Sequence, residues 1–155
     1  MRAIIQRTEG AKISAEVNGD YQVTGEIGHG LLVLLGVEES DNAEDVDYLF
    51  RKIKDMRIFN DDAGKMNLSV MDVNGSIGIV SQFTLHANTK KGNRPSFIRA
   101  AKPDKAESLY EEFIMKMETV IKGKVITGIF GAMMKIDFIN DGPVTIIIDS
   151  INREL

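Results

Sequence analysis

The segment Ser81–His86 (SQFTLH) carries the densest group of side chains in this sequence that could do chemistry. On an extended strand alternate side chains share a face, so Gln82, Thr84 and His86 would point the same way. Such a row is a poor pattern for a core, because each buried polar group left without a partner costs roughly 1–3 kcal/mol. The pattern indicates either a functional site or an edge strand with a solvated face.

Thr84 has a hydroxyl that could attack an ester, but a hydroxyl nucleophile needs a base within hydrogen-bond reach. His86 shares its face, yet two residues along a strand are roughly 7 Å apart. Two mechanisms therefore remain open. Either Thr84 is the nucleophile, or the site only positions water and substrate, with backbone N–H groups near Phe83 or Thr84 stabilising an oxyanion.

Gly142-Pro143 is the second unusual feature. Proline removes a hydrogen-bond donor and belongs at the edge or start of a strand, and the glycine before it allows another backbone or a ligand to approach closely. An X–Pro bond adopts the cis form at a cost of about 0.5–1 kcal/mol, and the sequence does not reveal the isomer. Taken alone, the dipeptide predicts a turn.

Composition excludes several chemistries. The chain has no cysteine, which excludes disulfides, thiolate catalysis and a thiolate zinc site. With only His29 and His86 present, a histidine-rich metal site is not expected. The general nucleotide-binding, metalloprotease and serine-hydrolase motifs are absent, so we expect no metal and no cofactor. Gly28-His29-Gly30 predicts a turn in which His29 is structural.

The net charge of −4 is not typical of a protein that grips duplex nucleic acid through phosphates alone. Basic charge is nevertheless concentrated locally between His86 and Lys105, against the single acid Asp104. The basic residues are Lys90, Lys91, Arg94, Arg99, Lys102 and Lys105. A solvated loop is the simpler interpretation of this stretch.

Periodicity predicts the elements that must position these residues. The apolar run Leu31–Val37 suits a strand covered on both faces. The expected strands are Arg2–Thr8, Lys12–Val17, Tyr21–Ile27, Leu31–Val37, Ser76–Leu85, Met133–Ile139 and Val144–Asp149.

Two helices are expected. The first is capped by Ser40 or Asp41, and the second opens at Pro103 and ends at Gly123. Their apolar residues recur at three- and four-residue spacing, Val46, Leu49, Phe50, Ile53 and Met56 in the first and Ala106, Leu109, Tyr110, Phe113, Met117 and Val120 in the second. The order of elements predicts a single α/β domain over residues 1–155, with two packed β-sheets and two main helices on one face.

The sequence opens directly into a strand pattern and shows no secretory apolar segment. Its longest apolar run, Leu31–Leu35, is too short to cross a bilayer. We therefore expect a cytoplasmic protein with no membrane partner.

Taken together, these segments resemble the D-aminoacyl-tRNA deacylase family, and the similarity runs nearly end to end. The blocks that carry it are Met1–Arg7, Gly30–Val37 (GLLVLLGV), Arg57–Phe59, Gly64–Asn67 (GKMN), Ser81–Leu85 (SQFTL), Arg94–Phe97 (RPSF), Phe130–Met133 and Gly142–Thr145 (GPVT). So many blocks in the same order make coincidence implausible.

The resemblance implies a homodimer with its active sites at the subunit interface. In the family the Gly-Pro bond is cis, and the dipeptide of one subunit enters the pocket of the other as a chiral gate. On that basis Ser81, Gln82, Phe83 and Thr84 form the pocket beside the scissile ester, and Gly142 and Pro143 form the gate. The gate would reject L-aminoacyl groups and admit D-residues and glycine, because a rigid backbone leaves no room for an L side chain.

The resemblance also assigns the remaining site residues. Phe130 and Met134 would pack on the terminal adenine of the tRNA, Arg7 would brace the Gly-Pro loop, and the basic stretch would face phosphates. The implied activity is hydrolysis of D-aminoacyl-tRNA, and of mischarged glycyl-tRNA, with the ribose 2′-hydroxyl assisting. Two alternatives remain, a relaxed relative that acts on L-aminoacyl-tRNA and a non-catalytic nucleic-acid-binding module on the same fold.

Overall fold

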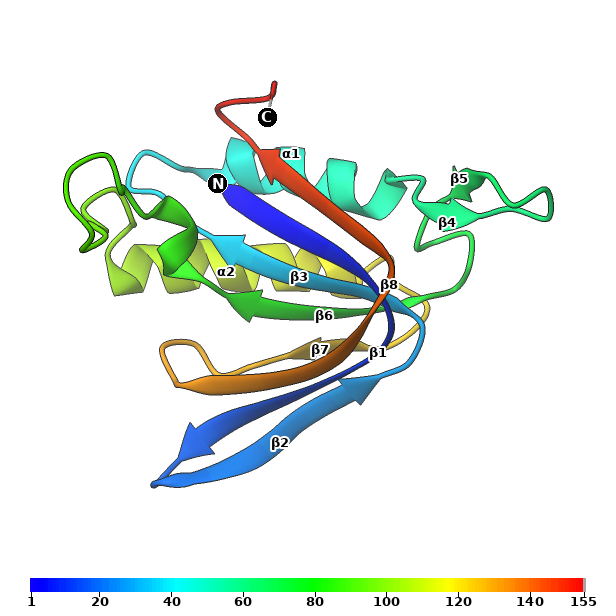
Figure 1. Cartoon of the computed structure of the whole chain (residues 1–155), viewed down its shortest axis with the longest axis horizontal. Coiled ribbons are helices and arrows are strands. Elements are labelled where there is room, and N and C mark those ends of the chain that lie inside the picture. Colours follow the sequence, from blue (N-terminus) through cyan, green and yellow to red (C-terminus); the bar gives the residue numbers. More distant parts are fainter. Residues whose placement is uncertain (155) are drawn as a thin grey trace.

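A computed structural model of the chain describes residues 1–154, and strand β1 (Arg2–Val17) runs through the centre of its sheet (Figure 1). The odd-numbered side chains Ala3, Ile5, Ala11, Ile13 and Ala15 are all buried. The alternation is interrupted at Thr8, which is buried, and Glu9, which is exposed, and then resumes on the same odd-numbered positions. The two predicted strands, Arg2–Thr8 and Lys12–Val17, are therefore one strand of sixteen residues.

Strand β2 (Asp20–Ile27) returns from β1 through a two-residue hairpin. Asn18 and Gly19 form its loop, both with positive φ (55° and 90°). An Asn-Gly pair tolerates this backbone better than other residues and matches the twist of the flanking strands.

The buried part of the sheet is parallel. Strand β3 (Gly30–Gly36) pairs antiparallel with β1 and parallel with β6 (Ser76–Ser81), and β7 (Val125–Thr127) extends the sheet in parallel beyond β6. Parallel neighbours need crossover connections, which usually contain a helix. Here α1 (Ala43–Asp55) lies between β3 and β6, followed by a small hairpin of β4 (Phe59–Asn60) and β5 (Met66–Leu68), and α2 (Pro103–Glu118) lies between β6 and β7.

Both helices lie on the same face of the sheet (Figure 1), as the sequence predicted. Helix α1 buries Val46, Leu49 and Ile53, and α2 buries Tyr110, Phe113 and Met117, so both predicted apolar faces are confirmed. Pro103 begins α2, as predicted. The end at Gly123 was wrong, because the helix ends at Glu118.

The predicted cap of α1 was also wrong. Asn42 is the cap, and its Oδ1 accepts a hydrogen bond from the Glu44 N–H (2.8 Å) while Asp45 accepts one from the Asn42 N–H (2.9 Å). Asp41 is buried instead, 2.6 Å from the Met1 ammonium group. A buried charge without a partner is costly. The Asp41 carboxylate therefore pairs with the Met1 ammonium group and does not cap the helix.

The prediction of two packed sheets needs correction. The strands form one six-stranded sheet, strongly bent, beside the small β4–β5 hairpin. The last two predicted strands are a single strand, β8 (Met134–Asp149), which pairs with β1 along its whole length. Bending nearly closes the sheet, because Gly25 of β2 comes to lie against Ile126 of β7 (Figure 1).

No helix among residues 1–154 is long and apolar enough to span a bilayer.

The near-closure of the sheet depends on the missing side chain at Gly25. A Cβ there would lie 2.7 Å from Ile126 Cβ, so Gly25→Ala should lower the free energy of unfolding by roughly 1–3 kcal/mol. Gly28→Ala is the matched control, because a Cβ at Gly28 meets nothing within 4 Å. Denaturant unfolding of both variants measures the difference, and equal stabilities would show that β2 and β7 do not pack as described.

Candidate active site

The polar segment after β6 is a helical turn. Strand β6 ends at Ser81, and Phe83–His86 form a single 3₁₀ turn, η1. The predicted strand Ser76–Leu85 was therefore too long, and Gln82, Thr84 and His86 do not share a strand face. The turn stands at the carboxyl end of a buried parallel strand, which is the usual place for a site in an α/β protein.

Two features of the turn suit the binding of a polar group. Gln82 Nε2 donates to Thr84 Oγ1 at 2.5 Å, which fixes both side chains at the solvent-exposed rim. The backbone N–H groups of Phe83 and Thr84 have no acceptor among residues 1–154. Both residues are exposed, so these N–H groups are available to an oxygen atom of a ligand.

His86 lies away from Thr84. Its side chain is 1% exposed, and Nδ1 lies 3.7 Å from Glu38 Oε2. Neither ring nitrogen has a hydrogen-bond partner within the described part of the chain. The expectation that His86 points with Thr84 was wrong. The expectation that His86 lies out of hydrogen-bond reach of Thr84 is confirmed, and among residues 1–154 the Thr84 hydroxyl hydrogen-bonds to Gln82 and to no base.

The Arg2 side chain holds the turn in place. Arg2 Nη1 donates to the Leu85 carbonyl oxygen at 2.8 Å, and its guanidinium also pairs with Asp149 at 2.8 Å. Burial alone would raise the pKa of Asp149, but the N–H groups of Asn152 and Ile151 and the Arg2 guanidinium hold that pKa below its ordinary value. Arg2 therefore faces a charged carboxylate at neutral pH.

Gly36 completes this support. A Cβ at Gly36 would lie 2.9 Å from the Gln82 carbonyl oxygen and 3.1 Å from the His86 ring. The turn thus packs directly on the backbone of β3.

Phe130 and Met134 lie near the same end of β6. The Phe130 ring is 5.8 Å from the ring of Tyr110, whose hydroxyl donates to the Ile79 carbonyl oxygen at 2.9 Å. Met134 packs over Gly128, just beyond β7. A Cβ added at Gly128 would lie 2.1 Å from the Met134 sulfur. Both side chains are half-buried, so each keeps an exposed surface beside the turn.

Gly142 and Pro143 form a wide bulge in β8, and the peptide bond between them is cis, as the resemblance implied. Gln6 pairs with Thr145 and Thr8 with Asn140, so the four residues 141–144 face the single residue Arg7. Both Gly142 and Pro143 are exposed, whereas Arg7 is buried. The bulge therefore displays the dipeptide outward from a fixed base.

Arg7 anchors this bulge. Its Nη1 donates to the Ile58 carbonyl oxygen at 2.7 Å, and its Nε lies 2.7 Å from Asp141 Oδ2, an ion pair without aligned hydrogen-bond geometry. A small hollow beside the pair is lined by Arg7, His29, Phe59, Asn60, Val73 and Asp141. The sequence analysis did not predict this contact with Asp141, the residue before Gly142.

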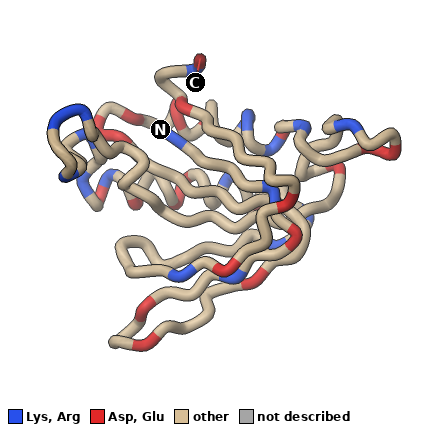
Figure 2. Tube along the Cα trace, in the orientation of Figure 1, with Lys and Arg blue, Asp and Glu red and all other residues tan. Residues whose placement is uncertain are grey.

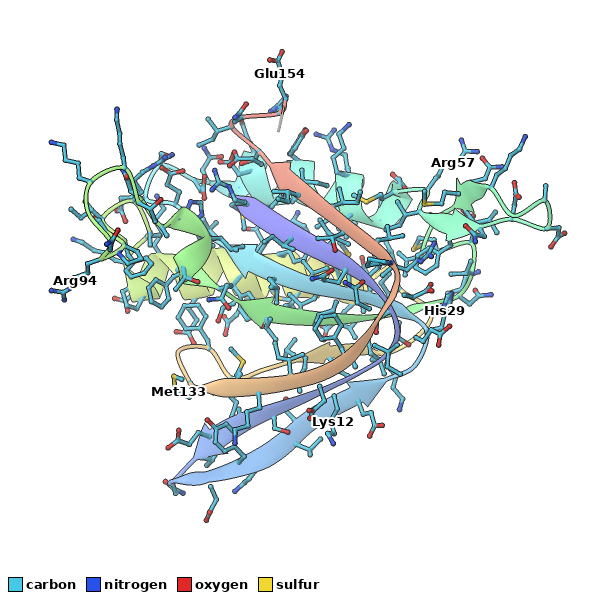
Figure 3. All side chains as sticks on the ribbon, in the orientation of Figure 1. Lys12, His29, Arg57, Arg94, Met133 and Glu154 are labelled. Carbon is cyan, nitrogen blue, oxygen red and sulfur yellow. The ribbon has the colours of Figure 1, made fainter. Side chains whose placement is uncertain are left out.

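Within one chain the turn and the Gly-Pro bulge lie at opposite ends of the sheet. Ser81 pairs with Leu35, which pairs with Ala3, whereas the bulge faces Arg7. Four residues along β1 separate the two sites by roughly 13 Å in the strand direction, and β3 and β1 lie between their strands. Figure 3 shows this separation, with Met133 at the end that carries the turn and His29, which lines the hollow beside Arg7, at the other.

Sequence reasoning missed the residues that support the turn, namely Arg2, Gly36 and Glu38. Their only signal was their type, a charged or glycine residue within or at the end of an apolar strand. Among residues 1–154, no group of three His, Cys, Asp or Glu side chains is arranged to hold a metal ion.

Comparison with known proteins gives a consistent result. A model of the family described as D-Tyr-tRNA(Tyr) deacylase matches residues 4–149. A protein of Flavobacterium johnsoniae named D-aminoacyl-tRNA deacylase is 56% identical over 99% of this chain and 100% of its own length. One of the same name from Akkermansia muciniphila is 53% identical over the same shares.

Two solved structures have a similar fold. The structure titled "c-Myc DNA Unwinding Element Binding Protein" has a TM-score of 0.85 and 38% identity, and the match covers 96% of this chain and 98% of the other. The structure of a probable eukaryotic D-amino acid tRNA deacylase has a TM-score of 0.76 over 94% of this chain and 97% of its own, and at 18% identity it supports the fold alone.

The ion pair at the bulge can be measured by a double-mutant cycle of Arg7→Ala and Asp141→Ala. Because Arg7 is 8% and Asp141 29% exposed at the side chain, we expect a coupling energy of roughly 1–3 kcal/mol in the free energy of unfolding. The control is the Lys12–Asp137 pair, which joins the same two strands at 3.7 Å but is 44% and 74% exposed. Its coupling should stay under about 0.5 kcal/mol, and equal couplings would argue against a structural role for Arg7.

Proposed function

Because the chain belongs to the D-Tyr-tRNA(Tyr) deacylase family, we propose that it hydrolyses the ester bond of D-aminoacyl-tRNA, releasing the free D-amino acid and the tRNA. The observation that carries the proposal is the arrangement of η1. It presents the unpaired backbone N–H groups of Phe83 and Thr84, and no base among residues 1–154 hydrogen-bonds to the Thr84 hydroxyl. The proposed place of action is the cytoplasm, where aminoacyl-tRNA is used.

The proposed mechanism uses the substrate's own chemistry. An aminoacyl ester is already activated, so catalysis requires a positioned water and stabilisation of the oxyanion that forms at the carbonyl oxygen. The N–H groups of Phe83 and Thr84 would donate to that oxyanion. The neighbouring 2′-hydroxyl of the terminal ribose would assist the attack, since no side chain in contact with Thr84 supplies a base.

We assign the recognition of the terminal adenine to Phe130 and Met134. Each is half-buried, at the same end of the sheet as the turn, and an aromatic or thioether face can stack on an unpaired base. The fixed position of Phe130 against Tyr110 means that little conformational entropy is lost on stacking.

The chiral gate requires a second copy of the chain. The Gly142-Pro143 dipeptide is exposed but roughly 13 Å along the strands from its own turn, so it would act on the turn of a partner in a symmetric homodimer. Exposed apolar side chains on β8, namely Phe138, Ile139 and Ile147, offer a surface for such an interface. In the pocket the rigid backbone would clash with an L side chain and admit a D side chain or glycine.

A second candidate function is a non-catalytic nucleic-acid-binding module. The structure named for binding a DNA unwinding element shares 38% identity and nearly the whole fold. Deacylation remains the preferred function, because Ser81, Gln82, Phe83 and Thr84 are all present and ordered around the two free N–H groups. The assay below also detects a relaxed relative that acts on L-aminoacyl-tRNA.

The gate predicts strict stereoselectivity. The purified protein should release tyrosine rapidly from D-Tyr-tRNA and not from matched L-Tyr-tRNA. The Gly142→Ala/Pro143→Ala variant should lose this activity, because the carbonyl groups of the dipeptide would also hold the α-ammonium group of the substrate. Release of tyrosine from both enantiomers by the unmodified protein would identify a relaxed relative. Release from neither would favour the nucleic-acid-binding module.

The subunit that supplies the gate is identified by mixing two inactive variants. The gate variant and a pocket variant, Phe83→Pro, which removes one of the two N–H donors at the first position of η1, should together recover about a quarter of the original activity per site. Half of the randomly mixed dimers are heterodimers, and each has one intact site. No recovery from a mixture that exchanges subunits would place gate and pocket in the same chain.

The RNA-assisted mechanism predicts that Thr84→Ala keeps substantial activity, because the variant retains the backbone N–H groups. Single-turnover deacylation of D-Tyr-tRNA measures the activity of the variant. In the complementary experiment, replacing the terminal 2′-hydroxyl of the tRNA by hydrogen should abolish the reaction. A trapped acyl-enzyme on Thr84 would overturn the choice of mechanism.

A further inference from the structure

A stretch of the chain around the turn contains no acid at all. Between Asp72 and Asp104 there is no Asp or Glu, although the chain has 23 acidic residues and a net charge of −4. This stretch includes β6, η1 and the loop of residues 87–102, which we call the basic loop. Figure 2 shows its tip as a cluster of basic residues at one end of the molecule, beyond the ends of β3 and β6.

The tip of the basic loop has a defined conformation. Asn88 and Ser96 exchange two backbone hydrogen bonds, of 2.8 and 3.0 Å, which close the segment 89–95 into a hairpin-like loop. Within it the Lys90 N–H donates to Asn88 Oδ1 at 2.9 Å, and Gly92 supplies a positive φ of 70°. The cations of the tip are therefore carried by a closed loop, and less conformational entropy is lost on binding.

The basic residues divide into two groups. Arg99 Nε pairs with Glu38 at 2.5 Å, which raises the pKa of Arg99, and Lys105 donates to the Glu39 carbonyl oxygen. These two contacts tie the base of the loop to the end of β3. By contrast Lys90, Lys91 and Arg94, at the tip, are exposed and form no ion pair with any of residues 1–154, and Figure 3 shows Arg94 pointing away from the molecule. Lys102 is likewise exposed and forms no ion pair with the described residues, but it lies directly before α2 and outside the tip.

The base of the loop touches the candidate active site directly. The rings of Phe97 and Phe83 meet edge to face, with centroids 5.2 Å apart, and the Ala101 N–H donates to the Val37 carbonyl oxygen at 3.0 Å. Three free cations are thus held on a fixed loop that adjoins the turn.

We propose that Lys90, Lys91 and Arg94 bind the phosphates of the RNA strand whose 3′ end occupies the site. This inference rests on the proposed function, because it is the ester in the pocket that places the adjoining nucleotides beside the loop. A polyanionic strand releases counterions when cations neutralise its phosphates, so the contact contributes affinity without reading sequence. Of the other basic residues in the stretch, Arg99 and Lys105 serve the structure of the loop.

The test compares two triple variants that remove the same charge. The first is Lys90→Gln/Lys91→Gln/Arg94→Gln. The control is Arg51→Gln/Lys52→Gln/Lys122→Gln, which changes three exposed cations away from the turn. Since all six side chains are exposed, both variants should have the thermal stability of the original protein.

Deacylation of D-Tyr-tRNA is measured from 50 to 200 mM salt, in parallel with D-tyrosyl-adenosine, a substrate without phosphates. The loop variant should lose about tenfold in kcat/KM for the tRNA at low salt, through KM, and its slope of log(kcat/KM) against log[salt] should be shallower by about 2. Hydrolysis of D-tyrosyl-adenosine should be unchanged, and the control variant should match the original protein on both substrates. An unchanged salt slope, or an equal loss on the phosphate-free substrate, would overturn the inference.

Failure of the proposed function gives a different result, namely no hydrolysis of either substrate by the original protein. In that case the binding of uncharged tRNA, followed by fluorescence anisotropy, tests the loop alone. Weaker binding by the loop variant than by the control variant would support the inference, and equal dissociation constants would overturn it.

Discussion

The pairing of β1 with β8 is the constraint on which the rest of the molecule depends. Two sixteen-residue strands run antiparallel along their whole length, and one end of β1 meets β3 while the other meets β2. The sheet must therefore bend between the two halves. The four-residue bulge opposite Arg7 lies at that point, so the same irregularity that lets the strands bend also displays Gly142 and Pro143.

The candidate site depends on backbone more than on ionisable side chains. Its turn rests on the backbone of β3 at Gly36, and the Arg2 guanidinium holds it through a carbonyl oxygen of the chain. The histidine in the segment is buried beside Glu38, away from Thr84. In the mechanism we propose, such a site would orient a reactive ester and stabilise charge on its carbonyl oxygen, while proton transfer would be left to water and to the substrate.

Charge is distributed to suit such a substrate. The acids that make the chain negative overall are absent from residues 73–103, which form the strand, turn and loop at one end of the sheet. Two acids approach this region from the segment after β3. Glu38 pairs with Arg99, and the Glu39 carboxylate accepts a hydrogen bond from the Lys102 N–H, so both help to fix the loop. The local electrostatic field at the site can thus be positive on a protein whose net charge is negative.

The sequence by itself determined the local elements, because their signals lie within a few residues. The alternation along β1, the apolar faces of α1 and α2, and the run Leu31–Val37 follow from repeats of 2.0 and 3.6 residues. Resemblance to the family likewise predicts that SQFTL forms the pocket and Gly142-Pro143 the gate.

Tertiary structure decided what depends on distant partners. The turn at Phe83 forms where β6 ends against Gly36, and His86 is buried beside Glu38. Asp41 pairs with the Met1 ammonium group, and the bend of β1 and β8 joins the two expected sheets into one. The separation of the turn and the bulge within one chain could not be predicted from the sequence either. The number of residues between two strands does not fix their distance when other strands, here β3 and β1, lie between them in the sheet.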